Sequence, residues 1–154
     1  MKTGLVLGRF QPLHLGHISL LKQALEENDE LVICIGSAQL ADPLLIEERK
    51  RRIEEQMKLL PKKNYRIVCL NDLEERSKWP MYLKHSCALE GKEVIIYRAD
   101  TDKITTHLKE LHFEIRIIKR FLFPYKGPDG IYYEFSSARE IRELHTKTQT
   151  MHLI

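Results

Sequence analysis

Short apolar runs alternate with amphipathic stretches along most of the chain. The apolar runs are rich in valine, isoleucine and leucine, which predicts strands at residues 4–7, 31–35, 66–70, 93–97 and 113–118. Between them, apolar positions recur at helical spacing and predict helices at residues 18–27, 45–60, 80–90 and 101–111. The first two strands are nearly continuous apolar runs, which is typical of parallel strands covered on both faces. We therefore predict an α/β fold with a doubly wound, parallel five-stranded sheet and helices on both faces.

The pattern changes in the segment after residue 118. Residues 119–135 hold aromatic side chains around Pro128-Asp129-Gly130, a turn signal that predicts a small hairpin serving as a flap or as an edge feature. Ser137 stands three residues before Glu140, which matches a capping box and predicts that a final helix begins beside Ser137. Residues 146–154 show no convincing signal, so this tail is left unassigned.

The segment between the first predicted strand and the first predicted helix carries the most informative chemistry. It reads Gly8-Arg9-Phe10-Gln11-Pro12-Leu13-His14-Leu15-Gly16-His17. A helix N-terminus offers unpaired backbone N–H groups and a partial positive charge, both of which attract phosphate. An arginine and two histidines in front of that helix add further donors. The segment therefore predicts a nucleotide site beyond the carboxyl ends of the strands, where parallel sheets bind ligands.

Length and charge favour one domain that handles small anions. The 154 residues are 43% hydrophobic, so residues 1–154 are expected to form a single domain with a core of its own. Lysine and arginine number 25 against 22 acidic residues, and the net charge of +3 is spread along the chain. This mild excess forms no stripe interleaved with aromatic residues. It favours anionic small molecules over nucleic acid as partners.

Cysteine usage and the first residues indicate the compartment. Cys34, Cys69 and Cys87 are odd in number and lack C-x-x-C spacing, and two of them lie in apolar strand-like runs. Buried, reduced thiols are therefore expected rather than disulfides or zinc ligands. About five apolar residues precede Arg9, too few for a secretory signal or a membrane span. These features predict a soluble, cytoplasmic protein that does not associate with a membrane.

Two separated motifs resemble those of a known superfamily. The run His14-Leu15-Gly16-His17 resembles the HxGH signature of nucleotidyltransferases, and Ser137 to Arg142 resembles their C-terminal S-x-x-x-x-R motif. Residues 29–39, which end in Gly-Ser-Ala-Gln, are similar to the second-strand region of archaeal-type nicotinamide mononucleotide adenylyltransferases. Glu48-Arg49 resembles the end of that family's T-x-x-E-R element, and Asp72 to Trp79 has the spacing of its D…W segment. The resemblance covers most of the chain and implies a Rossmann-like domain.

The resemblance implies transfer of an adenylyl group from ATP to nicotinamide mononucleotide, which gives NAD and pyrophosphate. The attacking phosphate is already anionic and pyrophosphate leaves readily, so neither a covalent intermediate nor a protein base is needed. The protein has to align the two nucleotides in line and stabilise the charge that grows on the phosphates. Magnesium (Mg2+) is expected to arrive bound to ATP, since the sequence shows no dedicated carboxylate cage.

Carried onto this chain, the resemblance implies three groups of site residues. The catalytic group is His14, His17, Arg9, Arg49 and Arg142, with Arg49 as a phosphate clamp. The ATP-binding group is Gly8, Phe10, Gln11, Gly16 and Ser137. The group for the nicotinamide nucleotide is Gly36, Ser37, Gln39, Asp72 and Trp79, with the Trp79 ring stacking on the nicotinamide.

Each assignment has a simpler alternative. Arg49 lies in the charged run Glu47 to Arg52, which is also typical of an exposed helix face with i,i+4 ion pairs. Taken alone, Arg142 is a solvated helix charge, Ser137 a helix cap and Trp79 a core or rim aromatic. The remaining histidines have no motif context and are interpreted as surface or core residues: His85, His107, His112, His145 and His152.

Several positions depart from the family pattern and leave the acceptor open. These are Leu44-Leu45-Ile46 in place of a phenylalanine and threonines, Arg76 in place of a small amide, Arg98-Ala99-Asp100 in place of a Ser-Gly-Asn-like turn, and Arg139 in place of a threonine. One alternative is another small-molecule nucleotidyltransferase that acts on phosphopantetheine or uses CTP. A second is a catalytically idle module that binds NAD or ATP and regulates a partner. The family often assembles, so a homo-oligomer is left open as well.

Overall fold

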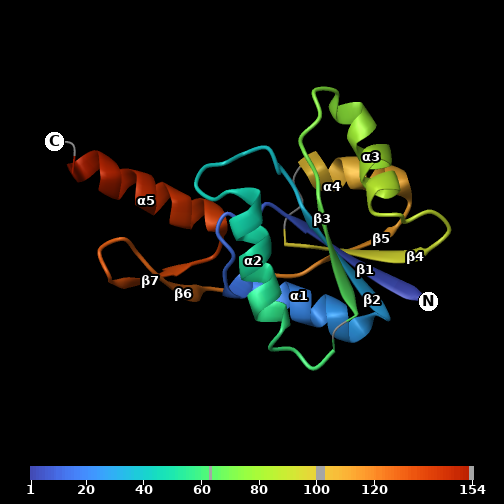
Figure 1. Cartoon of the computed structure of the whole chain (residues 1–154), viewed down its shortest axis with the longest axis horizontal. Coiled ribbons are helices and arrows are strands. Elements are labelled where there is room, and N and C mark those ends of the chain that lie inside the picture. The colour runs from blue at the N-terminus through green and yellow to red at the C-terminus, as the bar shows by residue number, and fades with distance from the viewer. Residues whose placement is uncertain (63, 100–102, 153–154) are drawn as a thin grey trace.

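A parallel five-stranded sheet forms the centre of the molecule, with its strands in the order β3-β2-β1-β4-β5 (Figure 1). The computed structural model describes residues 1–62, 64–99 and 103–152. The strands are β1 (Lys2–Gly8), β2 (Glu30–Ile35), β3 (Tyr65–Cys69), β4 (Glu93–Arg98) and β5 (Glu114–Ile117). All five lie where the apolar runs predicted them. The predicted doubly wound α/β architecture is confirmed.

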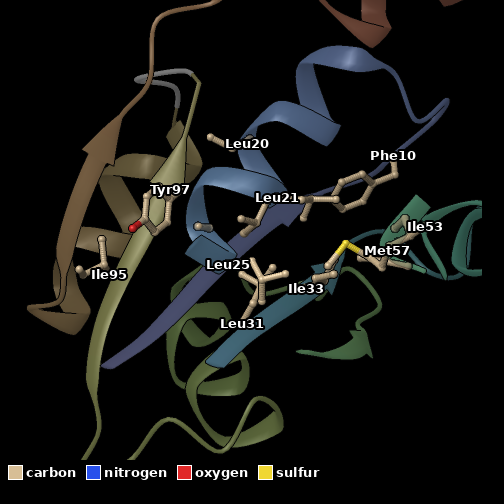
Figure 2. Packing of buried hydrophobic residues seen from close by; sticks show 13 residues of the cluster. Phe10, Leu20, Leu21, Leu25, Leu31, Ile33, Ile53, Met57, Ile95 and Tyr97 are labelled. Atoms are coloured by element: carbon tan, nitrogen blue, oxygen red, sulfur yellow. The ribbon is translucent and has the colours of Figure 1, made fainter. Parts of the chain in front are cut away.

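One face of the sheet is covered by α1 (Leu15–Glu27) and α2 (Ile46–Met57). Figure 2 shows their apolar side chains packed over those of the strands. The cluster contains Leu21, Leu25, Ile53 and Met57 from the helices, and Val6, Ile33, Ile95 and Tyr97 from the strands. Because side chains alternate along a strand, the intervening residues point to the other face.

The other face is covered by α3 (Trp79–Ser86) and α4 (Lys103–Leu108). Leu83 and Leu108 of these helices share a buried cluster with Leu5 and Ile96 of the strands. The predicted helices are thus confirmed; α1 begins three residues earlier than expected, and the others are shorter than expected. The helix expected over residues 80–90 ends at Ser86, and Ala88 follows with a φ of 51°, a left-handed conformation that stops the helix.

Two further helix predictions need correction at their ends. The stretch expected over residues 45–60 is helical only to Met57. The one expected over residues 101–111 is α-helical to Leu108 and continues as a 3₁₀ turn over Lys109–Leu111. Its predicted start, residues 101–102, lies outside the described residues.

The strand order reverses next to β1. From this central strand, β2 and β3 extend to one side, and β4 and β5 extend to the other. A crevice forms where such a sheet changes direction, beyond the carboxyl ends of its strands. The turn after β1 and the last residue of β4, Arg98, therefore lie on the rim of one ligand-binding position.

The predicted hairpin is present as β6 (Phe123–Lys126) and β7 (Tyr132–Phe135). The two strands pair in an antiparallel, two-stranded sheet of their own, so the hairpin is not an edge feature of the five-stranded sheet. Gly130 has a φ of +84° in the turn, a conformation that favours glycine. Phe123 and Phe135 pack on Ile141 of the following helix. The hairpin is therefore joined to that helix by a small core.

The last helix, α5 (Ala138–His152), continues through most of the segment that was left unassigned as a tail. It starts as predicted, because Ser137 Oγ accepts a hydrogen bond from the backbone N–H of Glu140 at 3.3 Å. The Glu140 carboxylate accepts from the backbone N–H of Ser136 at 3.2 Å, one residue earlier than in a standard capping box. Figure 1 shows α5 extending away from the sheet.

The cysteines differ in part from the prediction. All are free thiols, as expected, and Cys34 and Cys87 are buried. Cys69 is exposed, although it lies in an apolar run, because it is the last residue of β3. Within the described ranges, none of the helices combines the length and apolar character that crossing a bilayer requires.

Candidate active site at the carboxyl ends of the strands

Two histidines jointly cap the helix that follows β1. Nδ1 of His14 accepts a hydrogen bond from the backbone N–H of His17 at 3.2 Å, and Nδ1 of His17 accepts from the backbone N–H of His14 at 3.3 Å. An imidazole nitrogen that accepts a hydrogen bond carries no proton. Both rings therefore carry their proton on Nε2, where it is available to a ligand.

The two imidazoles lie in a stack of aromatic rings. Their centroids are 3.7 Å apart with 19° between the planes. Phe10 contacts the His17 ring with centroids 4.7 Å apart, and Phe123 stacks on His14 at 4.3 Å. A Cβ on Gly16 would lie 2.9 Å from the His14 ring, so the helix can pass this close to the stack only with glycine at that position.

The histidines are neutral at physiological pH. Burial and the nearby Arg120 guanidinium lower the pKa of His14 to about 4. Burial also holds the pKa of His17 well below its usual value, and the neighbouring His14 and Arg120 add to the effect. Between them, the rings supply Nε2–H donors without adding positive charge. Cationic contacts to phosphate must come from the arginines.

Arg49 lies beneath the turns that follow β1 and β2, with 0% of its surface exposed. Its Nη1 donates to the backbone carbonyls of Arg9 and Gly36, each at 3.1 Å. Its Nη2 donates to the carbonyls of Ser37 and Leu40 at 3.1 and 3.0 Å. One guanidinium thus ties both turns together.

This geometry corrects the prediction for Arg49. A phosphate clamp needs donors that face the ligand, and here the terminal nitrogens are held by carbonyls. The exposed-face alternative is also wrong for this residue, although its neighbours Arg51 and Arg52 do form the expected i,i+4 ion pairs with glutamates. Phe10 and Ser37, in the two turns, have φ values of 53° and 51°, which side-chain-bearing residues adopt rarely. Arg49 holds these turns in place.

Asp72, in the loop after β3, organises a further part of the site. Its carboxylate accepts hydrogen bonds from Ser37 Oγ at 2.9 Å and from Gln39 Nε2 at 2.9 Å. Its backbone N–H donates to Gln39 Oε1 at 3.0 Å. Gln39 therefore supports that loop through Asp72, and it is not among the residues that line the cavity.

A cavity of about 580 Å³ opens at this rim of the sheet. Most of the residues predicted for the site line it: Gly8, Arg9, Phe10, Gln11, His14, Gly16, His17, Gly36, Ser37, Asp72, Trp79, Ser137 and Arg142. Arg49 and Gln39 are the exceptions, for the reasons given above. Trp79 is half-buried and packs in part against the core on its own face of the sheet, so its ring serves both core and cavity.

The start of α5 reaches the first loop, as the paired motifs required. Nη1 of Arg142 donates to the backbone carbonyl of Gln11 at 2.6 Å. Burial, followed by nearby Arg9 and Arg139, lowers the pKa of Arg142. Cations therefore crowd one end of the cavity, and a polyanion would relieve their repulsion.

Several arginine, lysine and histidine side chains on the cavity wall were not assigned to the site from sequence. They are Arg76, Arg98, His107, Lys119, Arg120 and Arg139. Against them, Asp72 is the one carboxylate among the described residues that line the cavity. Position could have identified three of them, because Arg98 ends β4, and Lys119 and Arg120 closely follow β5. His107, interpreted from the sequence as a surface or core residue, lines this cavity.

The comparison with known families agrees with this geometry. A sequence model of the family described as cytidylyltransferase-like matches residues 5–144, nearly the whole chain. The chain belongs to the cytidylyltransferase-like family. The resemblance seen in the HxGH and S-x-x-x-x-R motifs is thereby confirmed at the level of the superfamily.

Two relatives that are similar to the chain have the same name. A nicotinamide-nucleotide adenylyltransferase of Thermoplasma volcanium is 34% identical over 115 residues, which cover 72% of this chain and 62% of that protein. One from Pyrococcus furiosus is 38% identical over 91 residues, covering 54% of this chain and 48% of that protein. In each case the match spans less than two thirds of the relative's length.

A solved structure supports the fold. The bifunctional NMN adenylyltransferase/ADP ribose pyrophosphatase of Francisella tularensis superimposes with a TM-score of 0.71 at 22% identity. The match covers 92% of this chain and 41% of that chain. At this level of identity the likeness concerns the Rossmann-like domain alone.

Proposed function

We propose that the chain transfers an adenylyl group from ATP to nicotinamide mononucleotide, giving NAD and pyrophosphate. The observation that carries the proposal is that the neutral histidine pair, Arg9 and Arg142 line the same cavity as Asp72 and Trp79. The histidines and arginines suit a triphosphate, and the Trp79 ring suits a nucleotide with a flat ring. Relatives named nicotinamide-nucleotide adenylyltransferase support this choice of acceptor.

In this mechanism the protein aligns the substrates and stabilises charge. A phosphate oxygen of nicotinamide mononucleotide attacks the α-phosphorus of ATP in line, the bond from that phosphorus to the bridging oxygen breaks, and pyrophosphate leaves. The Nε2–H groups of His14 and His17 donate to phosphate oxygens as their charge grows. Arg9, exposed in the cavity and without a side-chain partner in the described part of the chain, supplies permanent charge together with Arg142.

The donor set fits a metal that enters with its substrate. Among the described residues there is no cluster of three histidine, cysteine or acidic side chains able to hold a metal ion. Asp72 is already bonded to Ser37 and Gln39. Mg2+ would therefore be held by the ATP phosphates, where it supplies charge neutralisation. A structural neighbour from Francisella tularensis was solved with AMP and a manganese ion, which supports a requirement for a divalent cation.

The reaction is expected to take place in the cytoplasm. The free thiols of Cys34, Cys69 and Cys87 support a reducing compartment, and ATP is the proposed donor.

Replacing Trp79 with alanine is expected to raise KM for nicotinamide mononucleotide about tenfold and to change kcat little. Stacking of a base on an aromatic ring contributes about 1–3 kcal/mol, and this contact forms before the chemical step. Steady-state kinetics with saturating ATP measures it. Met81→Ala, an exposed position of the same helix outside the cavity, is the control. An unchanged KM would remove Trp79 from the acceptor site.

The proposed function is tested by measuring pyrophosphate release from ATP, with Mg2+, against a panel of acceptors. Turnover with nicotinamide mononucleotide, and none with phosphopantetheine or with CTP in place of ATP, is the expected result. Turnover with phosphopantetheine alone would show that the proposed acceptor is wrong, while adenylyl transfer as the reaction would stand. ATP binding without turnover on any acceptor would contradict the proposal and favour a regulatory module.

A further inference from the structure

Phe123 connects the hairpin to the histidine pair. It is 1% exposed at the start of β6, and its ring lies nearly parallel to that of His14, with 17° between the planes. His17 stacks on the same imidazole, also nearly parallel. The two partners must therefore occupy opposite faces of the His14 ring. Phe123 closes the face that water would otherwise reach.

The hairpin is held so that this contact is maintained. Phe123 shares a buried cluster with Phe135 of β7 and Ile141 of α5. Arg120, just before β6, donates from Nη1 to the carbonyl of Ser136 at 2.7 Å. The helix that continues from the hairpin binds the first loop through Arg142. The hairpin and α5 thus both contact the loop that carries the histidines.

We propose that Phe123 is a positioning residue for adenylyl transfer: its ring keeps His14, and through the shared cap His17, aimed at the ATP phosphates as neutral Nε2–H donors. The role in the reaction rests on the proposed function. The effect on the histidines rests on the ring geometry of the free protein. Two independent measurements can therefore separate them.

Protonation of His14 would break this arrangement. A proton on Nδ1 prevents that nitrogen from accepting a hydrogen bond from the backbone N–H of His17. The cap then opens, and the Nε2–H groups of both histidines lose their orientation toward the phosphates. The groups that face His14 are His17 on α1 and Arg120 before β6. Arg120 disfavours protonation of His14, and His14, Arg120 and Arg142 of α5 disfavour protonation of His17. Without the Phe123 ring, hydration of His14 lowers the cost of charging it.

The test compares Phe123→Leu with Phe135→Leu. Phe135 belongs to the same hairpin core but contacts Tyr125 and Tyr133 rather than a histidine. NMR titration of the free protein should show the pKa of His14 rising by about one unit or more in Phe123→Leu, and staying as in wild type in Phe135→Leu. In turnover, Phe123→Leu should lose about tenfold in kcat at pH 7 with KM for ATP within about twofold. The acid limb of the pH profile of its kcat should move to higher pH.

The proposal is overturned if the Phe123→Leu variant folds and keeps both the wild-type pKa of His14 and the wild-type pH profile of kcat. It is also overturned if the Phe135→Leu profile moves equally, because the effect would then be general to the hairpin. If Phe123→Leu does not fold, the wild-type protein decides: nuclear Overhauser effects between the Phe123 and His14 rings are expected, and their absence overturns the proposal. A wild-type protein without turnover on nicotinamide mononucleotide contradicts the proposed function and leaves the titration result standing.

Discussion

His17→Ala is expected to lower kcat by about 100- to 1,000-fold while KM for ATP stays within about threefold, the range seen when one preorganised donor to a developing oxyanion is removed. The neutral ring of His17 offers a single Nε2–H, because its Nδ1 is occupied by the backbone N–H of His14. A neutral donor gains most when charge grows on the phosphates, which happens in the transition state. Binding of ground-state ATP relies more on the arginines.

The measurement is steady-state and single-turnover kinetics of the variant, together with its melting temperature. Loss of the reciprocal cap costs about 1 kcal/mol of stability, so the protein should remain folded. His85→Ala is the matched control, since His85 is an exposed histidine on α3 outside the cavity. A loss of ATP affinity as large as the loss of turnover would contradict the assigned role.

Arg49→Met is expected to destabilise the fold by about 3–5 kcal/mol, because a buried guanidinium that satisfies several carbonyls is replaced by a side chain with no donor. The carbonyls of Arg9, Gly36 and Leu40 would lose the hydrogen bonds that Arg49 donates to them. Both turns that adopt positive φ would then lose their support. Chemical denaturation followed by circular dichroism measures the change.

Arg51→Met serves as the control, because Arg51 lies on the same helix and its side chain is exposed, in ion pairs with Glu48 and Glu55. Exposed pairs of this kind contribute about 0–1 kcal/mol. A stable Arg49→Met variant with a greatly raised KM for ATP would restore the phosphate clamp that the sequence suggested.

The difference between Arg49 and its neighbours illustrates where pattern-based prediction stops. The run Glu47 to Arg52 has the composition of an exposed helix, and Arg51 and Arg52 behave accordingly. Arg49 lies on the face of α2 that meets the turns after β1 and β2. Which face that is depends on how the helix docks on the sheet. Local composition carries no information about it.

Phe123 shows a similar limit. The turn residues around Gly130 predicted the hairpin, because a turn is encoded by a few adjacent residues. Nothing in the hairpin predicted that its first strand would pack on a histidine more than a hundred positions earlier in the chain. That contact arises only when the hairpin and α5 fold back on the first loop.

The sequence by itself determined the strands and the helices that alternate with them, the loop that carries two histidines in front of the first helix, and the capped start of α5. These features depend on periodicity and on neighbours within a few residues, where hydrophobic spacing and backbone hydrogen bonding act locally. Tertiary structure decided that Arg49 supports two turns, that Gln39 holds Asp72, and that Phe123 shields His14. Those roles depend on burial and on partners distant in sequence, and burial is what lowers the pKa of a histidine or turns an arginine from a surface charge into a structural donor.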